Sequence, residues 1–348
     1  MAHDPKREDY ERLSLRYALA LDTSDPHGAT QAFSTFGRRF AQDRDSLPQS
    51  DADRAFHLVA LATEAIDYRL PFATDEQAET LIRRGRELLE EALSLDGRCF
   101  DAVRMLSASR LRSVDERYQF LAERVDEVRD ACEEERDRAC EALGGERAAL
   151  GALLSLRPYW RWLASMAEDA LICGRNHDAV AAAERLLESD PHDLSDVRFT
   201  LAYALAKLED EEGLERLAQR YETISPLRAA DDAWLILARC ALAHKRCDFD
   251  GARSELRRLL NAYPGCAGSL IHQTELPDGE FARLRVQPYS EDELIVALSE
   301  GVVLLQEGND RSGRGVFGMW VMREATRMDP AAALEVAHAT NNEGEGRS

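Results

Sequence analysis

The sequence predicts an all-α protein, a superhelical stack of irregular helical hairpins (an α-solenoid). Apolar residues follow a helical period along most of the chain, and a small residue recurs twelve positions before a helix-stopping residue. These pairs are Ala179 with Pro191, Ala252 with Pro264, Gly318 with Pro330 and, without the proline, Gly85 with Gly97. Because each small residue stands early in an apolar-periodic segment, we expect it where two helices cross closely.

Length and helix-start signals agree with this class. The 348 residues are 45% hydrophobic, which supplies a large core that a hairpin stack distributes along its length. Four hydroxyl residues stand three positions before an acid or amide, the spacing of a capping box at a helix start. They are Ser50 with Asp53, Thr74 with Gln77, Ser113 with Glu116 and Ser290 with Glu293.

Residues 1–70 are expected to form an N-terminal helical segment with weak repeat character. Apolar periodicity indicates three helices, around 7–21, 29–41 and 51–68, with breaks at Pro48 and Pro71. The stack itself is expected over 71–340. Its first clear element is a helix over 76–95, the second helix of a hairpin, which carries Gly85 at the small position.

A long helix is predicted over 113–143. Its apolar residues alternate in steps of four and three, which indicates a heptad-like seam on one face. Many acids alternate with arginines in the same segment, a pattern typical of a solvated outer face. An acidic docking strip for a basic partner is the alternative interpretation of these charges. Self-association through the seam is a further one.

The hairpins are clearest between 157 and 264. Gly174 permits the turn between two apolar stripes, the second of which carries Ala179 and ends at Pro191. A middle hairpin over 197–221 repeats the scheme with Gly213 but lacks the closing proline, and 234–264 restores it.

These residues carry a resemblance. Arg157-Pro158-Tyr159-Trp160, the run from Gly174 through Ala179 to Asp190-Pro191, and the segment 198–208 resemble tetratricopeptide repeat (TPR) proteins, nearest to bacterial relatives of the suppressor-of-tumorigenicity-7 group. The resemblance covers 157–264 well and 74–111 and 290–330 loosely. It implies a non-enzymatic scaffold or adaptor that binds a peptide or protein on a concave surface. The sequence departs from the usual pattern at Ala183, where an aromatic is common, and at Ser225, which replaces a proline.

Two segments lack helical periodicity. An insertion over 266–290 contains a turn sequence at Pro277-Asp278-Gly279, and it is interpreted either as a linker packed over the last hairpins or as a loop that lines the ligand groove. The tail over 341–348, with Gly344 and Gly346 among polar residues, is expected to be disordered.

An aromatic cluster supplies the candidate binding residues. Tyr159, Trp160 and Trp162 fall within four positions of one helix, where they cannot all face inward, so we expect one edge to line a groove or a partner contact. The candidate partner-binding residues are Tyr159, Trp160, Trp162, Arg198, Pro277 and Asp278. The alternative function is a small-ligand sensor or enzyme with a pocket near Trp160 and the Pro277 loop.

Catalytic, metal and cofactor patterns are weak, and the sequence predicts none of the three. Gly313-Arg-Gly-Val-Phe-Gly318 fits a dinucleotide motif but follows a helix instead of a strand. Cys240, His244 and Cys247 have helical spacing, yet a closed zinc site needs four ligands, and Cys266 completes it only if the chain folds back. His177 and His192 stand beside acids at predicted turns, where such residues serve as caps.

Net charge and the absence of targeting signals limit the expected partners and compartment. A formal charge of -21 disfavours nucleic acid and favours a basic peptide or protein as partner. The first residues lack a secretory signal, and the longest near-apolar window, 148–156, is about half of the ~20 residues that a membrane span needs. Seven cysteines without CxxC spacing fit reduced thiols, so we expect a cytoplasmic protein without membrane contact.

Overall fold

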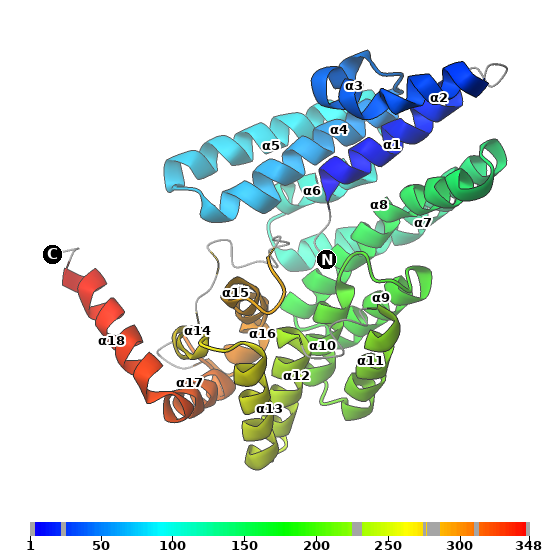
Figure 1. Ribbon diagram of the computed structural model, residues 1–348. Coiled ribbons are helices and arrows are strands. Elements are labelled where there is room, and N and C mark those ends of the chain that lie inside the picture. The colour runs from blue at the N-terminus through cyan, green and yellow to red at the C-terminus, as the bar shows by residue number, and fades with distance from the viewer. Residues whose placement is uncertain are drawn as a thin grey trace. The chain divides into compact units, whose positions relative to one another are not determined.

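The computed structural model describes residues 4–21, 26–224, 232–273, 276, 286–309 and 313–345. Within these ranges the chain forms eighteen α-helices and no strand, so the predicted all-α class is confirmed (Figure 1). The chain divides into two compact units. We call His3–Ser165 the N-terminal unit, and Met166–Ser348, together with Met1–Ala2, the C-terminal unit.

The N-terminal unit consists of seven helices and most of an eighth. They are α1 (Pro5–Ala20), α2 (Pro26–Ser34), α3 (Phe36–Asp43), α4 (Asp51–Thr63), α5 (Asp75–Leu95), α6 (Phe100–Arg110), α7 (Val114–Ala142) and α8 (Gly145–Ile172), whose last residues belong to the C-terminal unit. A π-helical turn, Glu64–Arg69, extends α4. The single helix expected over 29–41 is two helices, because the chain bends at Thr35, whose hydroxyl donates to the carbonyl of Ala32.

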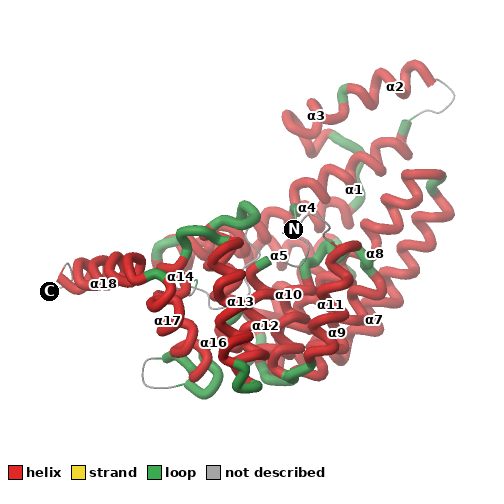
Figure 2. The backbone as a smooth tube through the Cα atoms, turned by 60° about the horizontal axis from the view of Figure 1, so that its bottom comes forward, coloured by secondary structure: helices red, strands yellow, loops and turns green. Residues whose placement is uncertain are grey.

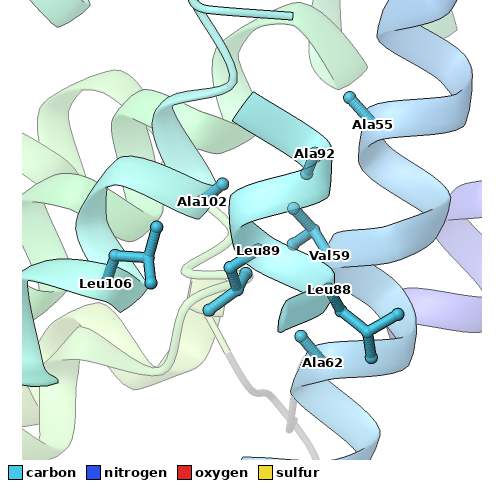
Figure 3. Packing of buried hydrophobic residues seen from close by; sticks show 8 residues of the cluster. All are labelled: Ala55, Val59, Ala62, Leu88, Leu89, Ala92, Ala102 and Leu106. Atoms are coloured by element: carbon cyan, nitrogen blue, oxygen red, sulfur yellow. The ribbon is translucent and has the colours of Figure 1, made fainter. Parts of the chain in front are cut away.

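The core of this unit lies between α4, α5 and α6 (Figure 3). Eight buried apolar residues from these helices meet there: Ala55, Val59, Ala62, Leu88, Leu89, Ala92, Ala102 and Leu106. Gly85 faces Ile66, and a Cβ atom on it would lie 2.5 Å from the Cδ1 atom of Ile66, so a larger residue would require the Ile66 side chain to move. Since α4 and α5 share this core, the boundary expected at residue 70 falls inside one unit.

All four predicted helix caps are present. Ser50, Thr74, Ser113 and Ser290 are the N-cap residues of α4, α5, α7 and α15 (Glu291–Glu300). The Ser113 hydroxyl accepts from the backbone N–H of Glu116 at 3.1 Å, and the Glu116 carboxylate accepts from the N–H of Arg112 at 3.0 Å. These bonds satisfy backbone donors that the first helical turn leaves open.

The C-terminal unit contains the clearest hairpins. Its further helices are α9 (Asn176–Ser189), α10 (Val197–Lys207), α11 (Glu211–Ile224), α12 (Ala233–Lys245), α13 (Phe249–Ala262), α14 (Ala267–His272), α16 (Val302–Leu305), α17 (Val316–Met328) and α18 (Pro330–Glu345). Figures 1 and 2 show α9 to α13 packed as neighbours. The small residues Ala179 and Ala252 are fully buried.

Two expectations for this unit differ from the structure in the residues that it describes. The insertion expected over 266–290 begins as a helix, because Ala267, Leu270 and Ile271 are buried and α14 packs against α17 and α18. The tail expected to be disordered from 341 is helical to Glu345, since α18 starts at a capped turn and a started helix gains one hydrogen bond per added residue.

Gly318 lies where α17 closely approaches the backbone at the end of α16. A Cβ atom on it would collide with the backbone carbonyl oxygen of Leu305, which cannot move as a flexible side chain can. We therefore expect Gly318→Ala to lower the free energy of unfolding by about 1–3 kcal/mol. Gly97→Ala is the matched control because a Cβ atom there meets nothing within 4 Å. Denaturant unfolding of both variants checks this, and equal stability would contradict the assigned crossing.

Candidate functional site

The three clustered aromatic side chains of α8 are buried. Tyr159, Trp160 and Trp162 are 4%, 5% and 0% exposed, so the expectation that one edge of the cluster faces solvent is wrong. Trp162 is buried because neighbouring helices cover it. Its ring packs against Phe100 of α6 and Phe120 of α7, and its indole N–H donates to the carbonyl of Leu121 at 2.9 Å.

Arg198 is also buried and serves the loop between α9 and α10. Its guanidinium donates to Asp193 at 2.8 Å and to Asp196 at 2.7 Å, and it lies over the Phe199 ring at 4.1 Å from the centroid. Both acids adopt left-handed backbone conformations. With the side chain 5% exposed, Arg198 is not available to a partner, which corrects its assignment as a binding residue.

The remaining two candidates, Pro277 and Asp278, lie outside the described residues. The alternative of a small-ligand pocket named Trp160 and the Pro277 loop as its walls. Trp160 is buried, and the Pro277 loop lies outside the described residues.

The residues of the weak metal and nucleotide patterns lie in packed positions and in a turn. Cys240 is buried and its thiol donates to the carbonyl of Ala252, and burial raises the pKa of this thiol. His244 packs against the rings of Phe249, Phe317 and Trp320, and burial lowers its pKa. Among the described residues no group of three or more His, Cys, Asp or Glu side chains is arranged to hold a metal ion.

The glycine motif closes a turn. The backbone N–H of Gly315 donates to the carbonyl of Leu305 at 2.7 Å, and this bond brings the chain from α16 into α17. A Cβ atom on Gly315 would collide with the Glu307 carbonyl, so this glycine is required for close backbone approach.

A buried ionic network joins α1, α6 and α8 in the N-terminal unit. Arg161 donates to both carboxylate oxygens of Asp101, at 2.6 and 2.5 Å, and to Glu8 at 2.9 Å. Glu8 also accepts from Arg12 at 2.8 Å and lies 3.3 Å from Arg157. Glu8 and Asp101 are 0% and 2% exposed. Because its members lie up to 153 positions apart, sequence reasoning missed this network; the only local signal is the i,i+4 spacing of Glu8 with Arg12.

Burial and ion pairing oppose each other at these acids. Burial raises the pKa of Asp101, but the adjacent Arg161 guanidinium outweighs it and holds the pKa below its usual value of 3.8. At Asp9, whose carboxylate pairs with Arg44 at 2.6 Å and His57 at 2.8 Å, the balance is the same and the pKa is lowered. The folded form of each group therefore binds its proton less readily than the unfolded chain.

We predict that this difference makes stability pH-dependent in acid. Because the folded-state pKa values of Asp9 and Asp101 are lowered, their ion pairs stabilise the folded protein. This stabilisation is fully present above the unfolded-state pKa of 3.8, and it is lost as the pH falls through the folded-state pKa values. The free energy of unfolding should thus decrease as pH is lowered below about 4. Urea unfolding at a series of pH values measures it. A free energy of unfolding that rises in this range would contradict the assigned pairs.

A surface of a different kind runs along α7. Buried Leu121, Val125, Val128 and Cys132 form a seam on one side of this helix, as its heptad-like pattern predicts. On the opposite side lie exposed carboxylates that alternate in steps of four and three from Glu123 onward, with Glu116 one heptad before Glu123. We call them the acidic stripe, and its members are Glu116, Glu123, Glu127, Asp130, Glu134, Asp137 and Glu141. At 1.5 Å per residue the stripe is about 37 Å long.

The acidic stripe keeps an excess of negative charge. The helix Val114–Ala142 contains eleven acids and five arginines, a net formal charge of -6. Arg124 pairs with Glu127 at 2.9 Å and Arg129 with Asp130 at 2.8 Å, both on the exposed surface. Exposed ion pairs contribute only about 0–1 kcal/mol each, so a partner's guanidinium or ammonium groups can replace them at low cost.

Comparison of the sequence with protein-family models and with curated proteins finds no match. Among the described residues, no helix combines the length and the apolar character that crossing a bilayer requires.

Proposed function

We propose that this protein is a non-enzymatic interaction scaffold that binds a basic segment of a partner protein along the acidic stripe of α7. The observation that carries the proposal is the stripe itself: seven exposed carboxylates on one face of a 29-residue helix, whose opposite face is anchored in the core. A basic helix with Lys or Arg at steps of four and three presents its charges at the same spacing.

Two coarser features support a scaffold of this class. The helices pack as neighbouring hairpins with small residues at the crossings, which is the arrangement of helical-repeat proteins that bind peptides. We also propose, from the resemblance described above, that the protein is a member of the TPR proteins. All seven cysteines are free thiols, which supports a reducing compartment, and we place the protein in the cytoplasm.

The acidic stripe predicts salt-dependent binding of a defined probe. The probe is a labelled 21-residue amphipathic helix with arginines at steps of four and three, titrated with the protein by fluorescence anisotropy. The triple variant Glu123→Gln, Glu127→Gln, Asp130→Asn should weaken binding about tenfold or more, at about 0.5 kcal/mol for each lost pair. Raising the ionic strength should weaken binding to the unaltered protein as well, because exposed charges are screened.

A matched control distinguishes the acidic stripe from net charge alone. Glu79→Gln, Glu87→Gln and Glu91→Gln remove the same charge from exposed positions of α5 in the same unit. This control should bind the probe as the unaltered protein does. If both triple variants lose affinity equally, the probe senses only overall charge and the acidic stripe is not the site.

A further inference from the structure

The segment α15–α16 makes contacts that a regular hairpin stack does not predict. In such a stack each helix pair contacts its immediate neighbours. Here α15–α16 contacts α12 and reaches past it to α10, where the Tyr203 hydroxyl donates to the carbonyl of Ala297 at 2.7 Å. Lys207, at the end of α10, donates to the carbonyl of Val303 at 3.1 Å. The segment therefore lies across α10 and α12 together, on what we call the α10–α12 face.

In the hydrogen bonds that join them, the face supplies the donors and the segment the acceptors. Besides Tyr203 and Lys207, the indole N–H of Trp234 donates to Glu300 at 2.6 Å, and the nearby Tyr263 hydroxyl donates to Glu293 at 2.7 Å. Trp234 is itself held by parallel stacking on Phe199, 3.8 Å between centroids. Such a face complements a helix that carries carboxylates.

The accepting positions follow a helical spacing. Glu293, Ala297 and Glu300 stand at i, i+4 and i+7, the pattern of a helix that binds in a groove. Leu294 and Leu298, which follow two of these positions, are buried. Where the segment bends, a Cβ atom on Gly301 would lie 3.3 Å from the Tyr203 hydroxyl oxygen, so the absence of a side chain allows the close approach.

An exposed contact holds the end of the segment. Glu307 pairs with Lys207 at 3.1 Å and with Lys245, at the end of α12, at 2.8 Å. The Glu307 side chain is 40% exposed, whereas the Glu293 and Glu300 residues are 3% and 4% exposed. Glu307 is thus the most exposed of the three glutamates that hold the segment, and opening of the segment is expected to start there.

We propose that the α10–α12 face is a binding face for an acidic amphipathic helix of a partner protein, and that α15–α16 occupies it in this chain as a built-in competitor. Like Glu293, Ala297 and Glu300, the partner helix carries a carboxylate at position i, a small residue at i+4 and a second carboxylate at i+7. This inference goes beyond the acidic stripe of α7 and does not depend on it. The face selects an acidic helix, whereas the stripe selects a basic one.

The test uses the full chain and a labelled peptide with the sequence of residues 288–307. In Glu307→Ala both lysines lose their carboxylate, so the open fraction of α15–α16 rises and the peptide should bind about tenfold more tightly than to the unaltered protein. Amide hydrogen exchange over 293–305 should accelerate in parallel. The control is Glu211→Ala, which removes an exposed carboxylate paired with Arg246 in the same unit and should change neither measurement.

A second variant locates the binding. A peptide with Glu300→Ala loses the acceptor of the Trp234 N–H, whereas the protein's own segment keeps it, so this peptide should bind the Glu307→Ala protein without the gain in affinity. Two results would overturn the proposal: exchange over 293–305 that stays as in the unaltered protein, or opened exchange without a gain in peptide binding. A Glu307→Ala protein that dimerises would assign the helix to a second copy of the chain and would likewise overturn the partner assignment.

Discussion

Replacing Arg161 with methionine is expected to lower the free energy of unfolding of the N-terminal unit by about 3–5 kcal/mol. Arg161 makes two hydrogen bonds to Asp101, which is 2% exposed, and the nearest remaining cation, Arg104, is 3.6 Å away. Loss of the guanidinium leaves a buried carboxylate with little compensation, and a carboxylate in that state is strongly destabilising. Denaturant unfolding followed by far-ultraviolet circular dichroism measures the loss.

Two further variants identify the cause of that loss. Arg147→Met makes the same change at an exposed position of α8 and should alter stability by no more than about 0.5 kcal/mol. Adding Asp101→Asn to Arg161→Met removes the uncompensated charge and should restore part of the stability. If Arg147→Met and Arg161→Met cost the same, the network does not contribute as described.

Trp162→Ala is the second change with a large expected effect, about 3–5 kcal/mol. The ring is fully buried between Phe100 and Phe120, so truncation leaves a cavity that helices on two sides must collapse to fill. Trp162→Phe keeps most of the packing and loses only the donor to Leu121, so it should cost less.

The control for packing is an exposed ring in the same unit. Phe72 is 72% exposed, and Phe72→Ala should change stability by no more than about 0.5 kcal/mol. The same unfolding measurement serves all three variants. A Trp162→Ala protein as stable as Phe72→Ala would show that the aromatic cluster is not part of the core.

Local signals in the sequence predicted where helices start and which side of them is buried. Ser113 with Glu116 predicted the start of α7, and the alternation of apolar residues predicted its seam through Leu121 and Val125. Such features depend on residues within one or two turns. The small residue at Gly318 was predicted for the same reason, although the atom it approaches, the Leu305 carbonyl, was not.

Burial of the candidate binding residues could not be predicted from helical periodicity. Tyr159, Trp160 and Trp162 spread over about 160° of the circumference of α8, and burial of Trp162 requires α6 and α7 beside it. The acids that pair with Arg198 stand only five and two positions before it, but they reach it through left-handed backbone conformations that helical periodicity does not predict. The placement of α15–α16 over α10 depends on Ala297, 94 positions from its partner Tyr203.

The acidic stripe carries the proposed function, and affinity capture from cell extract with matched baits tests it most directly. The baits are the unaltered protein, the Glu123→Gln, Glu127→Gln, Asp130→Asn variant and the α5 control variant, compared at low and moderate salt. We predict a basic partner that the first and third baits retain at low salt, that the second loses, and that moderate salt releases. A partner retained equally by all three baits would contradict binding along α7.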